Sequence, residues 1–327
     1  MCQRQRFTRL PGLVAAFIAA FALALPATAQ DKYPSKTVRI IVGYSAGTTS
    51  DVFARIIANR LGEKWNQSVI VENREGAAGA IGSDAVAKAN PDGYTLLLNS
   101  NALTLLPLLR SKVPFDPFKD LAPIIQVAQT PNILLVGKEL GVANLKEYIA
   151  LAKKGQLQYA SSGRGTPSHI TVELFKSMAG IKVEEIPYKS SAQALTDTMS
   201  GQVSLNAPGL SQGLPHVKSG RMVALGITGS KRSPGAPDVP TLAEAGVPGY
   251  EAYGWHGIFA PAATPPEVLA FLSRELTEIL TAPEMREKFA AQGSEIVASK
   301  PADFAAFLRT DFAKWEKLFK ELGIKPE

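Results

Sequence analysis

Cysteine and histidine are scarce in this chain, and their scarcity limits the chemistry that it can perform. The single cysteine is Cys2, and the three histidines are His169, His216 and His256. One cysteine cannot build a disulfide scaffold. Because Cys2 lies in a segment that we expect to be removed, the mature chain also has no thiol nucleophile. The histidines are too widely scattered for metal-ligand spacing, so no metal site is expected.

The chain also has no large excess of one charge once its first 29 residues are set aside. The sequence carries 35 Lys and Arg against 29 Asp and Glu, a net charge of +6, but Arg4, Arg6 and Arg9 fall within the first 29 residues, where no acid occurs. Without these three, 32 basic residues stand against 29 acidic ones, which leaves +3. Nucleic acid is therefore not an expected partner, because its recognition requires clustered basic residues. Hydrophobic residues make up 46% of the 327 residues, which excludes disorder and fits two domains.

Long apolar runs are confined to the N-terminus. Residues 13–25 are apolar, follow the three arginines and precede Pro26 and the small residues Ala27-Thr28-Ala29. This order of basic, apolar and A-x-A segments is typical of a signal peptide. We therefore predict a signal peptide at residues 1–29, cleavage after Ala29 and a soluble mature protein in the periplasm. A membrane anchor is the alternative, which the short apolar run disfavours.

Short β-branched runs alternate with amphipathic segments from residue 31 onward, which is typical of an α/β fold. The first unit has predicted strands at 38–42, 69–71 and 95–98 and helices at 50–65 and 80–88. A second set has strands at 133–136, 157–160, 183–186, 203–206 and 223–228 and helices at 144–154, 167–178, 192–200 and 211–218. A capping box begins at Thr241, and helices at 265–282 and 302–322 close the chain. We predict two α/β halves, each a mostly parallel sheet flanked by helices.

Two loops that follow predicted strands are rich in glycine and hydroxyl groups, namely 43–51 and 161–169. Open α/β sheets bind ligands beyond the carboxyl ends of their strands. The second loop places Thr166 as an N-cap and Pro167 at the first helical position. A helix that begins there presents free N–H groups to an anion such as a carboxylate. The alternative is that both loops are capped turns without a ligand.

Other residues of catalytic or binding type fit no established motif. Segment 73–82 is rich in glycine but matches neither the dinucleotide fingerprint nor a phosphate loop, so no nucleotide cofactor is expected. Ser161 or Ser162 could form a hydrolase with His169, but the sequence G-x-S-x-G is absent. Segment 99–101 either contributes side chains to the cleft or caps the next helix.

A set of ordered motifs runs along nearly the whole mature chain. They are Tyr33-Pro34, Tyr44 to Asp51, Ala54-Arg55, Val71 to Arg74, Gly76, Gly79, Ile81-Gly82, Pro91 to Leu96, Ser161 to His169, Pro187-Tyr188-Lys189, Pro237 to Thr241, Trp255 and Pro261 to Pro265. In this order and spacing the chain resembles the periplasmic substrate-binding proteins of tripartite tricarboxylate transporters, also called Bug receptors. It departs from the usual family pattern at Thr48, Glu75, Ala78 and Ser190.

The resemblance implies a two-lobed periplasmic-binding-protein fold, type II-like, with the ligand cleft between the lobes. Lobe 1 would comprise residues 31–128 and 254–327, and lobe 2 residues 129–253, joined by crossing segments near 124–130 and 253–260. A small carboxylated ligand would contact both lobes. The residues expected to bind it are Tyr44, Ala46, Gly47, Thr48, Thr49, Asn99, Ser100, Ser161, Ser162, Gly163, Thr166 and His169.

The resemblance also implies a function. It predicts a monomeric receptor, without a cofactor and not an enzyme, that delivers an organic acid to the membrane subunits of a tripartite tricarboxylate-type transporter. An exported Ser/His hydrolase and a ligand sensor for a signalling membrane protein are the alternatives that the sequence leaves open.

Overall fold

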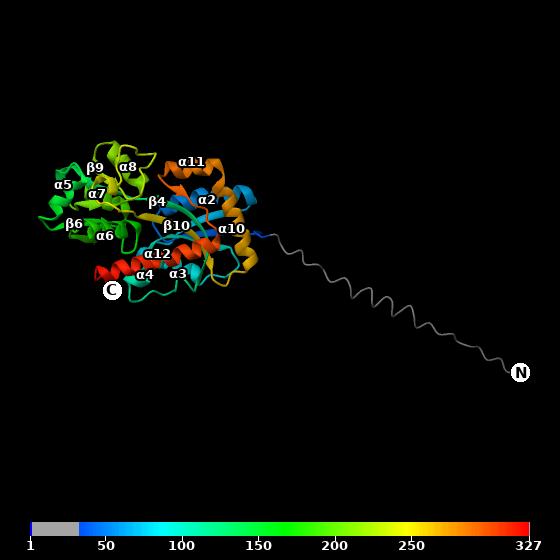
Figure 1. The fold of residues 1–327 in the computed structure, drawn as a ribbon. Helices are drawn as coiled ribbons and strands as arrows, with labels where there is room; N and C mark the ends of the chain where they lie inside the picture. Colours follow the sequence, from blue (N-terminus) through cyan, green and yellow to red (C-terminus); the bar gives the residue numbers. More distant parts are fainter. Residues whose placement is uncertain (2–32, 327) are drawn as a thin grey trace. The chain divides into compact units, whose positions relative to one another are not determined.

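Six strands form the first of two sheets in the computed structural model, which describes Met1 and residues 33–326 (Figure 1). Residues 2–29 of the predicted signal peptide lie outside the described residues. Contacts divide the chain into Met1–Ser35 and Lys36–Glu327, and the fold described below is that of the second unit. The strands of the first sheet, in the spatial order β11-β4-β10-β3-β1-β2, are β1 (Val38–Val42), β2 (Val69–Asn73), β3 (Thr95–Ser100), β4 (Leu121–Pro131), β10 (Tyr253–Pro261) and β11 (Glu295–Ile296).

Helices cover both faces of this first sheet. They are α2 (Thr49–Trp65), α3 (Ala80–Ala87), α4 (Ala102–Leu109), α10 (Pro266–Thr281), α11 (Pro283–Ala291) and α12 (Pro301–Glu321), with the 3₁₀ turn η1 (Ala77–Gly79) before α3. On one face, Phe53 of α2 stacks on Phe289 of α11 at 4.3 Å between ring centroids. On the other, Phe304 of α12 packs against Trp255 and Phe259 of β10. Because β1 and β3 are covered on both sides, they carry nearly continuous runs of buried apolar residues.

Five strands form the second sheet, in the order β7-β6-β8-β5-β9. They are β5 (Ile133–Gly137), β6 (Leu157–Ser161), β7 (Val183–Pro187), β8 (Leu205–Asn206) and β9 (Met222–Ile227). The surrounding elements are η2 (Lys138–Leu140), α5 (Leu145–Ala152), α6 (Pro167–Ala179), α7 (Ser191–Met199), α8 (Leu210–Lys218) and α9 (Leu242–Ala245). Tyr148, Phe175 and Tyr250 belong to the main core of this half, while Leu195 and Leu210 belong to a separate apolar cluster.

Both sheets are mixed, so the prediction that each is mostly parallel is wrong in that respect. In the first sheet β1 runs parallel to β2 and β3, but β10 is antiparallel to β3 and β4. In the second, β6 is parallel to β7 and β8, but β5 is antiparallel to β8 and β9. The expected crossing segments, 124–130 and 253–260, fall within β4 and β10. The chain leaves the first sheet along β4 and returns along β10, so two neighbouring strands must run in opposite directions.

The two-lobed α/β fold itself is confirmed, and most predicted helices and strands lie where the sequence places them. The capping box at Thr241 is present, with Glu244 as its partner. The strand expected at 203–206 is reduced to β8, and the elements α4, α11, β4, β10 and β11 have no counterpart among the predicted helices and strands. The positions of the lobe boundaries within the long strands β4 and β10 stay a prediction.

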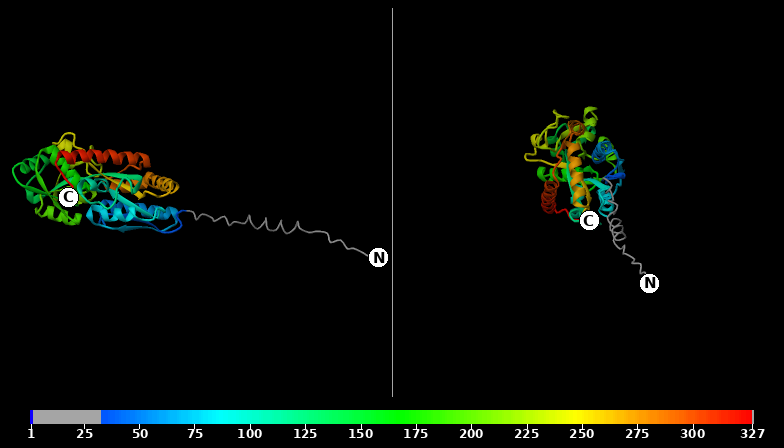
Figure 2. Two further views of the ribbon diagram at one scale, coloured as in Figure 1. Left: turned by 90° about the horizontal axis from the view of Figure 1, so that it is seen from below. Right: turned by 90° about the vertical axis from the view of Figure 1, so that its right-hand side faces the viewer.

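Helix α12 belongs to the chain's C-terminal segment yet touches both halves. It runs along the first sheet toward the second (red in Figure 2). Its residues Trp315 and Phe319 form one apolar cluster with Leu105 and Leu109 of α4 and Ile170 of α6. Within the described part of the chain, no helix combines the length and apolar character needed to cross a membrane.

Candidate functional site

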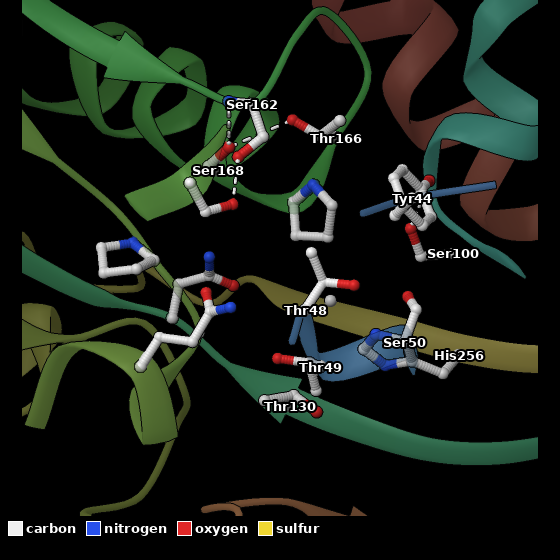
Figure 3. A pocket seen from close by; sticks show the side chains of 17 residues that line it. Tyr44, Thr48, Thr49, Ser50, Ser100, Thr130, Ser162, Thr166, Ser168 and His256 are labelled. Carbon is white, nitrogen blue, oxygen red and sulfur yellow. Dashed lines mark hydrogen bonds between the residues drawn. The ribbon is translucent and has the colours of Figure 1, made fainter. Parts of the chain in front are cut away.

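A cleft opens where the loop between β1 and α2 faces the loop between β6 and α6 (Figure 3). Its volume is about 550 Å³ with the open solvent at its mouth included. The residues that line it are Tyr44, Thr48, Thr49, Ser50, Ser100, Thr130, Asn132, Ser162, Thr166, Pro167, Ser168, Ser191, Pro208, Gly209, Gln212, Gly254 and His256. These described lining residues include no Lys, Arg, Asp or Glu, so the cleft is polar but uncharged.

The structure brings together half of the residues expected to bind ligand. Those that line the cleft are Tyr44, Thr48, Thr49, Ser100, Ser162 and Thr166. Those that do not are Ala46, Gly47, Asn99, Ser161, Gly163 and His169. The residues of this second group belong to the same two loops and to the end of β3, and several of them hold the lining residues in place through hydrogen bonds.

Tyr44 is held at the end of β3. Its hydroxyl donates to Asn99 Oδ1 at 2.8 Å and lies 2.8 Å from Ser100 Oγ. Asn99 is fully buried and donates from Nδ2 to Ser83 Oγ at 2.7 Å. Burial raises the pKa of Tyr44 well above its usual value, although the hydrogen bond with Ser100 opposes this. The phenol is therefore neutral at every physiological pH.

The first loop is organised by Asp51, in the first turn of α2. Its carboxylate accepts hydrogen bonds from Arg55 at 2.9 and 3.0 Å, from Gly47 N at 3.0 Å and from Asn73 Nδ2 at 2.9 Å. Burial by itself would raise the pKa of Asp51, but these donors outweigh it and lower the pKa. Thr48 is the N-cap. The first-turn N–H groups of Thr49 and Ser50 have no partner within the described residues, because no preceding turn exists to accept them.

The second loop confirms Thr166 as the N-cap residue and Pro167 as the first residue of α6. The hydroxyl of Thr166 donates back to Gly163 O at 2.6 Å and makes no side-chain cap bond. Ser168 Oγ accepts from Ser162 N at 3.0 Å, and His169 Nδ1 accepts from Gly165 N at 3.3 Å. Most N–H groups of this loop are thus used inside it. The N–H of Ser168 has no partner among the described residues.

Glu185 of β7 contacts three residues of the second loop and does not line the cleft. It accepts a hydrogen bond from Ser161 Oγ at 2.5 Å, and lies 3.3 Å from Arg164 Nε and 3.6 Å from His169 Nε2. Burial lowers the pKa of His169, while Glu185 opposes the shift. Nδ1 of His169 thus faces Gly165, and Nε2 faces Glu185. Ser162 instead pairs its hydroxyl with Ser191 Oγ at 3.1 Å, so His169 is hydrogen-bonded to neither of the two serines that the sequence suggests for a hydrolase.

Several lining residues escaped the sequence reasoning. Ser50 and Ser168 lie inside the two glycine- and hydroxyl-rich loops. Each is in the first turn of a predicted helix, and that position could have indicated them as binding residues. Thr130 and Asn132 lie at the β4–β5 junction, and Gln212 lies in the first turn of α8. His256 is placed by register, because β10 pairs it with Ser100. No local pattern could have found these last four. Among the described residues no group of His, Cys, Asp and Glu is arranged to hold a metal.

Comparisons with known proteins identify a family that this chain matches. Residues 53–324 match the model of the tripartite tricarboxylate transporter family receptor. The protein BugT of Bordetella pertussis is 36% identical, over 97% of this chain and 98% of its own. Among solved structures, R. palustris Rpa4515 with adipate has a TM-score of 0.86 at 35% identity, covering 90% of this chain and 100% of that one.

Two further solved structures are similar. The periplasmic binding protein BugD has a TM-score of 0.84 at 31% identity, covering 90% of this chain and 100% of that one. MatC from Rhodopseudomonas palustris with bound malate has a TM-score of 0.79 at 28% identity, covering 88% of this chain and 99% of that one.

Proposed function

This chain belongs to the tripartite tricarboxylate transporter receptor family, and we propose that it binds a small carboxylated organic acid in the periplasm. We further propose that it delivers the acid to the membrane subunits of a tripartite tricarboxylate-type transporter. Similar proteins were solved with adipate and with malate, which supports the carboxylate. The signal-peptide pattern in the sequence of residues 1–29 supports export.

The observation that carries the proposal is a pair of helix N-termini that open into one uncharged cleft. The free N–H groups of Thr49 and Ser50 belong to α2, and that of Ser168 belongs to α6. Such termini carry a partial positive charge and bind anions without a cationic side chain. Hydroxyl groups of Thr48, Ser162 and other lining residues would complete the recognition.

The lobes are proposed to close on this anion. Lobe 1 would span residues 31–128 and 254–327, lobe 2 would span 129–253, and the crossing strands β4 and β10 would act as the hinge. A monomer suffices for this movement. A receptor rather than a hydrolase is proposed because Ser161, Ser162 and His169, the side chains that the sequence offers for catalysis, have other hydrogen-bond partners.

A thermal-shift screen tests the proposed ligand class. The compounds are dicarboxylates, tricarboxylates, aromatic acids and nicotinate-like acids, each paired with its neutral amide. An acid at a hundred times its Kd should add about 2.7 kcal/mol to stability, and its amide should add little. Stabilisation by amides alone would contradict an anion site.

The role of the helix N-terminus has its own matched pair of variants. Thr49 is the first residue of α2 and follows Thr48 in extended backbone, a position that tolerates proline. Thr49→Pro removes the N–H and the hydroxyl, whereas Thr49→Ala removes only the hydroxyl. If one N–H binds the carboxylate, Thr49→Pro should bind about 10- to 100-fold more weakly than Thr49→Ala, the loss of ~1.5–3 kcal/mol. Equal affinities, with melting temperatures alike, would contradict the proposal.

Export is tested by mass spectrometry of the periplasmic fraction from cells that express the full chain. The mature protein should begin at Gln30. Residues 1–29 retained on the exported protein would contradict the predicted cleavage.

A further inference from the structure

The imidazole of His256 lines the cleft on the side of the first sheet. His256 lies on β10, paired in register with Ser100 of β3 and Ala128 of β4. Only 4% of the residue is exposed, yet it lines the cleft, and Figure 3 shows the ring beside Ser50 at the start of α2. It is the one ionisable side chain besides Tyr44 among the described lining residues.

The two nitrogens of this ring have different surroundings. Nδ1 is buried and has no hydrogen-bond partner within the described residues. The ring packs edge-on to Phe53, with centroids 5.0 Å apart and planes at 81°. Nε2 also has no hydrogen-bond partner among the described residues, but it is not fully buried. Because His256 lines the cleft, Nε2 is the ring nitrogen available to a ligand there.

Burial lowers the pKa of His256 to about 3, so the ring is neutral and carries one proton. A buried N–H without an acceptor is rarer in proteins than a buried acceptor without a donor. The proton therefore belongs on Nε2, where a group inside the cleft can accept it. His256 then acts as a neutral donor next to the free N–H groups of Thr49 and Ser50.

The groups at this end of the cleft that can only donate, His256 Nε2–H and the N–H groups of Thr49 and Ser50, therefore favour a ligand oxygen that accepts hydrogen bonds. A ligand ammonium would meet Nε2–H and the positive end of α2 there. Asp51 follows Ser50 in the first turn of α2. Its carboxylate already accepts hydrogen bonds from Arg55, Gly47 and Asn73. No acidic side chain lines the cleft among the described residues, and burying an unpaired ammonium is unfavourable.

We propose that His256 determines ligand specificity, selecting organic acids that present an acceptor oxygen beside the N-terminus of α2 and rejecting the corresponding amino acids. This inference rests on the proposed function, since it concerns the second group of a ligand whose carboxylate the same cleft holds. It names the substrate class as hydroxy, oxo or unsubstituted acids without an ammonium group.

Calorimetry on pairs in which the acid has hydrogen or a hydroxyl where its partner has an ammonium group tests the inference. The pairs are succinate and aspartate, glutarate and glutamate, adipate and 2-aminoadipate, and phenyllactate and phenylalanine. In any pair with a binder, the organic acid should bind at least tenfold more tightly. Equal or reversed affinities would overturn the inference and leave the proposed function intact. A binder from the thermal-shift screen that is outside these pairs is tested against its own amino-substituted analogue. If no acid of that screen binds, the proposed function fails, and the inference fails with it.

The variant His256→Gln tests the residue itself. It replaces the donor with an amide that can also accept from an ammonium group, so the preference within the binding pair should shrink at least fivefold. The same change at His216, on α8 and outside the lining residues, is the matched control and should leave the preference unchanged. An unchanged preference in folded His256→Gln would overturn the assignment.

A measurement on the wild-type protein keeps the test independent of that variant's folding. With three histidines in the chain, ¹⁵N-labelled imidazole signals can be assigned singly. His256 should show the neutral Nε2–H tautomer at pH 7, and its Nε2 signal should shift when the binding acid is added. An Nδ1–H tautomer, or an Nε2 signal unmoved by saturating acid, would contradict the inference.

Discussion

The side chain of Gln212 donates from Nε2 to the main-chain carbonyl of Gly47, 3.3 Å away. Gln212 lies in α8, which packs on the second sheet, and Gly47 lies in the β1–α2 loop of the first. The bond therefore joins the two walls at the cleft, and it links residues that are 165 positions apart in the chain.

Loss of this bond should speed ligand release. Gln212→Ala removes one hydrogen bond of about 1 kcal/mol, so the dissociation rate of a bound acid should rise about fivefold while the association rate changes little. Surface plasmon resonance separates the two rates. Gln202→Ala, at an exposed turn position, is the control. A slower association rate with unchanged dissociation would argue against a closing contact.

Ligand should also change the dimensions of the protein in solution. If β4 and β10 form a hinge, a saturating acid shifts the population toward the closed form. Small-angle scattering should then give a smaller radius of gyration with ligand than without. An unchanged radius, with binding confirmed by calorimetry in the same sample, would count against hinge closure.

Arg164 should contribute little to affinity, although it is the one Lys or Arg residue of the second loop. Its guanidinium lies 3.3 Å from Glu185 and it does not line the cleft. Arg164→Ala should therefore leave Kd within a few-fold of the wild type. Ser162→Ala should cost one hydrogen bond to a charged group, ~1.5–3 kcal/mol. Calorimetry with an ester-hydrolysis assay alongside checks both. Binding destroyed by Arg164→Ala alone would refute recognition by helix N-termini.

A β-branched residue at Gly47 should damage the site through backbone strain. Gly47 has φ of +80° and no atom near an added Cβ, so the cost lies in its conformation rather than in a clash. Gly47→Val should distort the loop before α2 and lower acid affinity at least tenfold. Gly155→Val, at a glycine that also has open space but no positive φ, should leave affinity unchanged. The same affinity in both variants would contradict the explanation.

Stability should fall on mild acidification because of the buried imidazole. Burial lowers the pKa of His256 from 6.5 to about 3. Between these values the unfolded chain binds a proton that the folded chain does not, so stability rises with pH across that window. One such group loses about 2 kcal/mol between pH 7 and pH 5. Urea unfolding should show a smaller loss in His256→Gln than in the wild type. If the wild type and His256→Gln lose the same unfolding free energy between pH 7 and pH 5, His256 is not the group responsible.

Local patterns are enough to predict most elements of this fold. β-Branched runs indicate β1 and β2, helical spacing indicates α2 and α12, and Thr166 with Pro167 marks the start of α6. These features depend on residues within one or two turns of each other, so the sequence alone carries them. The order and spacing of the motifs along the chain likewise indicate the family, because they too are properties of the linear sequence.

Tertiary structure decided what lies in the cleft. The sequence places His256 in a run that returns from the second half, and only the position of β10 between β3 and β4 sets that residue beside Ser100 and the start of α2. Gln212, Thr130 and Asn132 reach the cleft in the same way, from elements distant in the chain. Which strands become neighbours depends on how the two halves of the protein pack together, with β4 and β10 connecting them. Local spacing of residues in the sequence does not encode that packing. The antiparallel pairing of β4 and β10, missed at the sequence level, has the same cause.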